Sequence, residues 1–224
     1  MEYGLIGEKL GHSYSQMIHA RLADYRYELK EVAPERLDAF IEARNFRGLN
    51  VTIPYKQAVM KHCAELSPEA MEVGSVNMLI VRPDGSLFGH NTDIDGFIYM
   101  LRRGEIDPAG AKAVILGSGG TSLTARAALT RLGAREIVTV SRKGPVDYAA
   151  LYAEHADAEI LVNATPVGMY PKNGASPVEL DRLPKVRGVA DVIYNPEKTA
   201  LILAAQAKGI PAVSGLSMLV SQAR

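Results

Sequence analysis

Cysteine is almost absent from this sequence, because Cys63 is the single one among 224 residues. One thiol cannot form an internal disulfide or hold a zinc ion by itself, so a secreted disulfide scaffold and a structural metal site are excluded. Long hydrophobic runs are also missing, since none reaches the roughly 18 residues that cross a bilayer. The segment from Met1 to Gly4 lacks the basic and apolar start of a signal peptide. We therefore expect a cytoplasmic protein.

An excess of charge of either sign is lacking as well. The 25 Lys and Arg residues balance 25 Asp and Glu residues, so no bulk field attracts nucleic acid or an anionic membrane. Internal repeats and low-complexity segments are absent, and the five histidines form no spaced ligand pair, which argues against a catalytic metal. We expect a small-molecule partner, no metal, no nucleic acid and no membrane, in a monomer or homodimer.

What is present is a globular composition, 47% apolar and 22% charged, arranged in α/β order. In the first half, β-rich runs alternate with helical patterns, and Pro83-Asp84-Gly85 marks a hairpin turn. These patterns predict strands at 3–6, 27–32 and 48–53, a hairpin over 75–88, and helices at 16–23, 34–41 and 93–102. The glycine-rich, charged segment 104–110 is interpreted as a linker.

The second half repeats strand, helix, strand, which is typical of a doubly wound parallel sheet. We expect strands at 113–116, 136–140, 160–163 and 188–192, with helices at 121–132, 147–155 and 199–208. The predicted fold is therefore α/β with two domains. The first is an α/β domain over 1–103, to which 214–224 returns, and the second is a Rossmann-type domain over 104–213.

A glycine-rich turn follows the first strand of the second half. It comprises Gly117, Ser118, Gly119, Gly120 and Thr121. A strand, a tight turn and a helix in this order place exposed backbone N–H groups and a positive helix end where a pyrophosphate can bind. A third glycine at the usual spacing is missing, so a purely structural turn is an equally good interpretation of these residues alone.

The end of the next strand favours NADP over NAD. NAD sites usually carry a carboxylate there, for the ribose hydroxyls. This chain has Ser141, Arg142 and Lys143 instead, and two cations are suited to a 2′-phosphate. The alternative is that this basic pair only solvates a loop.

Three polar clusters in the first half each follow a predicted strand, at 11–15, 50–56 and 89–93. Open α/β sheets bind ligands at the carboxyl ends of strands, and hydroxyls, amides, one Lys and one Asp suit a polyhydroxylated acid. The same residues also have ordinary structural roles available. Ser13, Ser15 or Asp93 can cap a helix, and Lys56 can be a solvated side chain.

Eight motifs in order carry a family resemblance from Gly11 to Gln222. They are G-H-S-Y-S-Q-M-I-H, G-L-N-V-T-I-P-Y-K, G-S-V-N, H-N-T-D-I-D-G, G-S-G-G-T, V-N-A-T-P-V-G-M, D-V-I-Y-N-P and G-L-S-M-L-V-S-Q. With them the chain resembles the shikimate dehydrogenases. The resemblance implies reversible NADPH-dependent reduction of 3-dehydroshikimate to shikimate, in aromatic amino acid (chorismate) biosynthesis. It also implies a substrate-binding first domain and an NADP-binding second domain. The alternatives are a quinate/shikimate dehydrogenase using NAD, or a non-catalytic dinucleotide-binding regulatory module.

The resemblance also assigns roles to residues. Lys56 matches the catalytic lysine and Asp93 its carboxylate partner. The residues that match groups holding the substrate carboxylate are Ser13, Ser15 and Tyr194. Those that match groups reading the ring hydroxyls are Thr52, Asn77 and Gln222. Those near the nicotinamide are Val192, Gly215 and Met218.

The chain departs from the family locally at Gln16, where proline is usual, and at Met78, where threonine is usual, and more markedly in two other places. The usual N-R-T-x-x-R is replaced by the segment 141–146, which lacks the second Arg. Relatives also continue through a C-terminal helix, whereas this sequence stops at Arg224. We expect either a fragment, a chain without that segment, or the front portion of a longer bifunctional protein.

Overall fold

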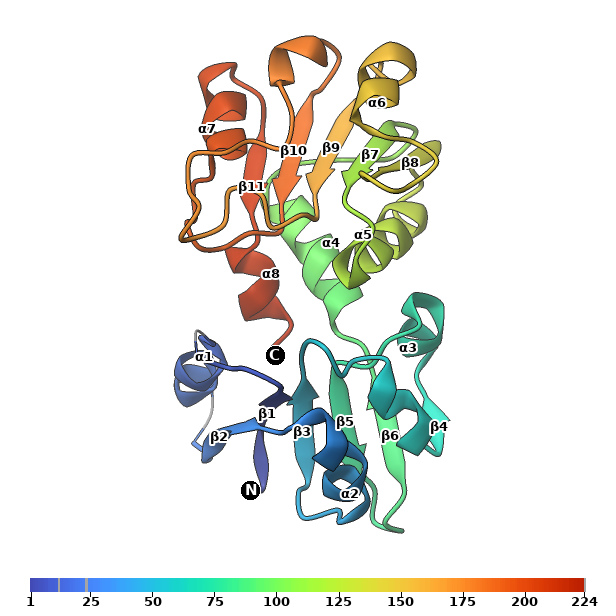
Figure 1. Ribbon diagram of the computed structural model, residues 1–224, viewed down its shortest axis with the longest axis vertical. Coiled ribbons are helices and arrows are strands. Elements are labelled where there is room, and N and C mark those ends of the chain that lie inside the picture. Colours follow the sequence, from blue (N-terminus) through green and yellow to red (C-terminus); the bar gives the residue numbers. More distant parts are fainter. Residues whose placement is uncertain (12, 23, 224) are drawn as a thin grey trace. The chain divides into compact units, whose positions relative to one another are not determined.

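A computed structural model describes residues 1–11, 13–22 and 24–223 (Figure 1). The chain falls into two compact units, Met1–Thr92 with the chain end from Ala223, and Asp93–Gln222. His12 of the first motif, Ala23 of the first expected helix and Arg224 lie outside the described residues. None of the described helices has both the length and the apolar character needed to cross a membrane.

The first unit is built on a six-stranded mixed sheet with the order β2-β1-β3-β5-β6-β4. Its strands are β1 (Tyr3–Gly7), β2 (Tyr27–Glu31), β3 (Gly48–Val51), β4 (Glu65–Leu66), β5 (Met78–Val81) and β6 (Leu87–His90). The strand β1 pairs in parallel with β2 and β3, whereas β5 runs antiparallel to β3 and β6. Its helices are α1 (Ser15–Leu22), α2 (Leu37–Glu42) and α3 (Pro68–Val73), with 3-10 turns at Pro34–Arg36 and Ala58–His62.

Alternation along these strands sends one set of side chains into the main core of the first unit. Ile6, Leu49, Leu79 and Leu87 are each no more than 2% exposed and pack in one cluster. Successive strand residues point to opposite faces, so their neighbours lie on the other face of the sheet. There a smaller cluster forms around Leu5, Leu10 and Tyr27.

The second unit is built on a parallel five-stranded sheet with the order β11-β10-β9-β7-β8. Its strands are β7 (Lys112–Leu116), β8 (Glu136–Val140), β9 (Ile160–Asn163), β10 (Gly188–Asp191) and β11 (Ala212–Ser214). Its helices are α4 (Asp93–Arg103), α5 (Gly120–Arg131), α6 (Tyr148–Glu154), α7 (Ala200–Ala207) and α8 (Leu216–Ser221), with a 3-10 turn at Leu180–Arg182. The α/β class and the doubly wound parallel sheet expected from the sequence are confirmed.

The two compact units do not follow the boundaries that the sequence indicated. Both α4 and α8, which were expected in the first domain, belong to the second unit. The helix α4 buries Ile94, Phe97 and Leu101 on one face, and it packs against α5, α8 and β11. A β-carbon on Gly96 would lie 3.1 Å from the carbonyl oxygen of Met218, so α4 and α8 approach closely. The apolar face of α4 is therefore covered within the second unit, and the chain passes between units at Thr92.

Candidate active site

The glycine-rich turn forms as expected between β7 and α5. Gly117 has φ of +104°, a conformation that L side chains rarely adopt. Its N–H donates to the carbonyl oxygen of Val140 at 2.8 Å, and a β-carbon on it would lie 3.0 Å from the carbonyl oxygen of Ala164. The turn therefore fits closely against the ends of β8 and β9.

The start of α5 leaves room for a ligand. Residues 118–120 are exposed and Thr121 is half-buried. β-Carbons built on Gly119 and Gly120 would meet no atom within 4 Å. Gly119 is the N-cap of this 12-residue helix and offers no side chain of its own to the first turn. Exposed backbone and a helix start in this arrangement fit a phosphate group.

The basic loop after β8 is held by its own backbone. Ser141 donates its N–H to the carbonyl oxygen of Val146 at 3.0 Å, and Gly144 donates to the carbonyl oxygen of Ser141 at 3.3 Å. The side chains of Arg142 and Lys143 remain exposed. The residues present therefore fit a dinucleotide that carries a 2′-phosphate.

The structure brings Val192 and Gly215 together. A β-carbon on Gly215 would lie 2.0 Å from the carbonyl oxygen of Val192, so only glycine fits. The Gly215 N–H donates to the carbonyl oxygen of Ile193 at 3.0 Å. Met218 lies one turn further along α8 and is 8% exposed. Tyr194, which follows Ile193, is half-buried.

A buried polar network connects these loops and was not predicted from the sequence. Asp191, at the end of β10, is fully buried. Its Oδ1 accepts from Asn163 Nδ2 at 3.1 Å and from the Ile193 N–H at 3.0 Å, and its Oδ2 accepts from Thr199 Oγ1 at 2.7 Å. Burial raises the pKa of Asp191, and these hydrogen bonds oppose that rise.

The partners of Asp191 extend the network to two further segments. Asn163 Oδ1 accepts from the N–H of Thr165 at 3.0 Å and from its hydroxyl at 2.7 Å. Thr199 is the N-cap of α7 and accepts from the Ile202 N–H. One carboxylate thus joins the loops after β9 and β10 to the start of α7. The motifs V-N-A-T and D-V-I-Y-N-P contain Asn163 and Asp191, and they were the available signal.

In the first unit, Lys56 and Asn77 lie on adjacent segments. The Val76 N–H donates to the carbonyl oxygen of Lys56 at 2.8 Å, and the Val51 N–H donates to that of Asn77 at 2.8 Å. Lys56 is half-buried and Asn77 is 5% exposed. Thr52 follows β3 and donates its N–H to the carbonyl oxygen of Ile6 at 2.9 Å. Lys56, Thr52 and Asn77 therefore all adjoin the end of β3.

The serine motif opens α1. Ser13 Oγ accepts from the N–H of Ser15, the first residue of α1, at 3.2 Å. Both residues are half-buried. This contact is the helix-start role that the sequence left open for Ser13, and it does not exclude a ligand on the remaining hydroxyl capacity.

Asp93 and Gln222 belong to the second unit, whereas Lys56 belongs to the first. Asp93 is the first residue of α4 and is 5% exposed. Gln222 is the C-cap of α8, is half-buried, and donates its N–H to the carbonyl oxygen of Met218 at 3.0 Å. Within residues 1–11, 13–22 and 24–223, no group of three His, Cys, Asp or Glu side chains is placed to hold a metal ion.

Comparison with known proteins connects this arrangement to one family. The family model of the shikimate dehydrogenase substrate binding domain matches residues 5–79. A shikimate dehydrogenase (NADP(+)) of Caldanaerobacter subterraneus subsp. tengcongensis is 36% identical over 99% of this chain and 88% of its own length.

Two solved structures agree with the sequence matches. A chorismate mutase/shikimate 5-dehydrogenase fusion protein from Clostridium acetobutylicum gives a TM-score of 0.91 at 40% identity, over 99% of this chain and 86% of that chain. Shikimate 5-dehydrogenase from Thermus thermophilus, solved with NADP(H) and shikimate, gives 0.87 at 32% identity, over 100% of this chain and 90% of that chain. The chain therefore belongs to the shikimate dehydrogenase family.

Proposed function

We propose that this protein catalyses the NADP-dependent, reversible reduction of 3-dehydroshikimate to shikimate, a step of aromatic amino acid biosynthesis. The observation that carries the proposal is a family match over nearly the whole chain, to relatives named shikimate dehydrogenase (NADP(+)). The glycine turn with an exposed basic loop supports the cofactor, because both features suit a phosphorylated dinucleotide.

We assign substrate binding mainly to the first domain and cofactor binding to the second. The substrate-domain family model matches residues 5–79, which lie within the first unit. The glycine turn at Gly117 and the basic loop at Arg142 lie within the parallel-sheet unit. Parallel α/β sheets bind dinucleotides at the carboxyl ends of their strands, where both segments are found.

In the proposed reaction, the residues assigned to the cofactor would hold NADPH, which would supply a hydride for the substrate carbonyl carbon. Negative charge then builds on the carbonyl oxygen, and the Lys56 ammonium stabilises that charge and donates a proton to it. We assign Asp93 as the carboxylate partner of Lys56, which is the role that the family resemblance implies for it. In the reverse direction, neutral Lys56 accepts the proton of the substrate hydroxyl.

The remaining site residues bind and orient. Hydroxyl groups that hold the substrate carboxylate are assigned to Ser13, Ser15 and Tyr194. Groups that read the ring hydroxyls are assigned to Thr52, Asn77 and Gln222. The pyrophosphate is assigned to the turn Gly117, Ser118, Gly119, Gly120 and Thr121, the 2′-phosphate to Ser141, Arg142 and Lys143, and the nicotinamide to Val192, Gly215 and Met218. Orientation by such groups lowers the entropic part of the barrier.

The direct test is the appearance of reduced cofactor, followed by absorbance at about 340 nm, with shikimate and NADP. Parallel assays replace NADP by NAD, and shikimate by quinate. Turnover with shikimate and NADP, and much weaker turnover in the other combinations, is expected. Binding of NADP without turnover of either substrate would instead favour a regulatory dinucleotide-binding module. Cytoplasmic placement and a monomeric or homodimeric state stay predictions from the sequence.

A further inference from the structure

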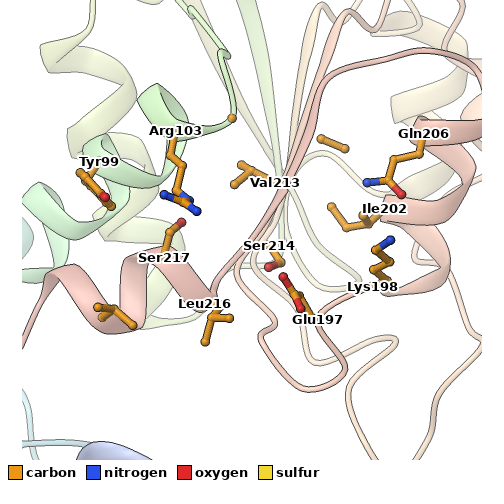
Figure 2. Close-up of a pocket in the computed structure, with 13 residues that line it drawn as sticks. Tyr99, Arg103, Glu197, Lys198, Ile202, Gln206, Val213, Ser214, Leu216 and Ser217 are labelled. Atoms are coloured by element: carbon orange, nitrogen blue, oxygen red, sulfur yellow. The ribbon is translucent and has the colours of Figure 1, made fainter. Parts of the chain in front are cut away.

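A pocket of about 470 Å³ lies within the second unit, beside β11 (Figure 2). It is bounded by α4, by α8, by β11 and by residues 197–206, which include most of α7. The strand β11 is at the edge of the sheet, so one of its sides faces no neighbouring strand. The glycine turn and the basic loop contribute no residue to this pocket. It is therefore separate from the assigned cofactor contacts of those two segments.

The charged groups at the pocket favour an anion. Arg103 of α4 and Lys198 before α7 are exposed, and neither has a hydrogen-bond or ion-pair partner in the part of the chain that the structure describes. Glu197 is the single acidic residue among those that line the pocket. Figure 2 shows Arg103 on the α4 side and Lys198 on the opposite side, with Val213 between them. Two cations therefore face a space with one carboxylate.

A buried hydroxyl adds an independent indication of a polar ligand. The Oγ of Ser217, on α8, is shielded from solvent and has no hydrogen-bond partner among the residues that the structure describes. Figure 2 shows it directed toward the Arg103 guanidinium. A buried polar atom without a partner costs free energy. An anionic oxygen placed beside Arg103 would accept a hydrogen bond from the Ser217 hydroxyl.

Gln206 and Ser214 add one amide and one hydroxyl to the lining, and most of the other lining residues are apolar. Val213, Ile202 and Val220 contribute aliphatic side chains, and Leu216 and Tyr99 are each 41% exposed. Apolar surface of this kind is stabilised when a ligand removes it from water. The lining therefore suits a molecule with one acidic end and an apolar body better than it suits an inorganic anion.

We propose that the pocket beside β11 binds a small organic anion with an apolar body. Its acidic group lies between Arg103 and the Ser217 hydroxyl, its body lies along Val213 and Leu216, and Lys198 adds positive charge from the opposite wall. This site goes beyond the proposed dehydrogenase reaction and does not depend on it.

The test measures binding of 4-phenylbutyrate to the full chain by titration calorimetry, without shikimate or cofactor. We expect saturable binding that Arg103→Gln weakens about tenfold or more, because a charge-assisted contact is lost. Arg102→Gln is the matched control, since the neighbouring arginine is exposed on the same helix but does not line the pocket. Ser217→Ala should weaken binding to a smaller extent.

Three further arms separate the possible sources of binding. The neutral analogue 4-phenylbutanol should bind equally to the unchanged protein and to Arg103→Gln. Inorganic phosphate should bind much more weakly than 4-phenylbutyrate, and saturating NADP should leave 4-phenylbutyrate affinity unchanged. The proposal would be overturned if 4-phenylbutyrate showed no saturable binding, or if Arg103→Gln and Arg102→Gln lost affinity equally. It would also be overturned if phosphate bound as tightly as 4-phenylbutyrate, or if NADP displaced 4-phenylbutyrate.

Discussion

Asn77 and Thr92 hold each other through two hydrogen bonds. The Thr92 N–H donates to Asn77 Oδ1 at 2.9 Å, and Asn77 Nδ2 donates to Thr92 Oγ1 at 3.0 Å. Thr92 immediately precedes Asp93, the first residue of α4. The amide assigned to substrate recognition thus also fixes the backbone that leads into the proposed catalytic carboxylate.

This double role predicts a specific kinetic pattern for Thr92→Val. The variant loses the hydroxyl that accepts from Asn77 and leaves a buried amide hydrogen without its partner. We expect kcat/KM for shikimate to fall about tenfold, with the KM for NADP nearly unchanged. Thr92→Ser, which keeps the hydroxyl, is the control and should remain close to the unchanged protein. Similar kinetics for the two variants would show that the contact has no role in turnover.

Lys56→Ala should remove most turnover and leave substrate and cofactor binding largely intact. The reason is that the ammonium contributes mainly in the transition state, where loss of such a group costs ~10²–10⁴ in rate. Lys61→Ala is a suitable control, because that lysine is exposed and pairs with Asp38. Steady-state assays and calorimetric binding of shikimate would be compared. Near-normal turnover of Lys56→Ala would remove it from the mechanism.

Arg142→Ala should raise the KM for NADP strongly and that for NAD little. Only the 2′-phosphate loses a charge-assisted partner, worth about 1.5–3 kcal/mol, or roughly 10- to 100-fold. Arg187→Ala provides a control, since that arginine pairs with Glu159 instead. If both cofactors lose affinity equally, Arg142 supports the fold or the adenine rather than cofactor choice.

The first unit should lose stability in mild acid through His19. This ring is 6% exposed, stacks on Tyr27 at 3.8 Å between centroids, and contacts the Tyr25 hydroxyl through Nδ1 at 2.5 Å. Burial lowers the pKa of His19 from its ordinary 6.5. As the pH falls, the unfolded chain is therefore protonated first, so the stabilisation present above 6.5 is lost progressively toward the lowered folded value.

Urea unfolding at about pH 7.5 and about pH 5.5 checks this expectation. The difference in unfolding free energy between the unchanged protein and His19→Gln should shrink at the lower pH, because glutamine does not titrate. A difference that stays constant or grows in acid would contradict the proposed neutral, buried His19.

The parallel sheet and the glycine turn could be predicted because their signals are local. The run 113–116 is continuously apolar, and it became part of the fully buried strand β7. The placement of α4 could not be predicted in the same way. Its apolar face shows that Phe97 and Leu101 need a covering surface, but the sequence does not say which elements supply it.

The candidate site shows the same division. Lys56 was predicted from the family resemblance, and Arg142 from the basic pair that it forms with Lys143. Both signals are visible in the sequence. The Asp191 network was not predicted, because a carboxylate at a strand end has no pattern that separates a buried acceptor from an exposed side chain. Its role became visible only from three contacts, with Asn163, Ile193 and Thr199.

The passage from one unit to the other falls between Thr92 and Asp93, inside a single short motif. A chimera of two relatives joined at this point would therefore take Lys56 from one parent and Asp93 from the other. A chimera that imports the NADP half also imports that half's own carboxylate, while its Thr92 and Asn77 come from the other gene. A chimera made to exchange cofactor preference should therefore work with a junction after Thr92 only when both parents carry a compatible H-N-T-D segment.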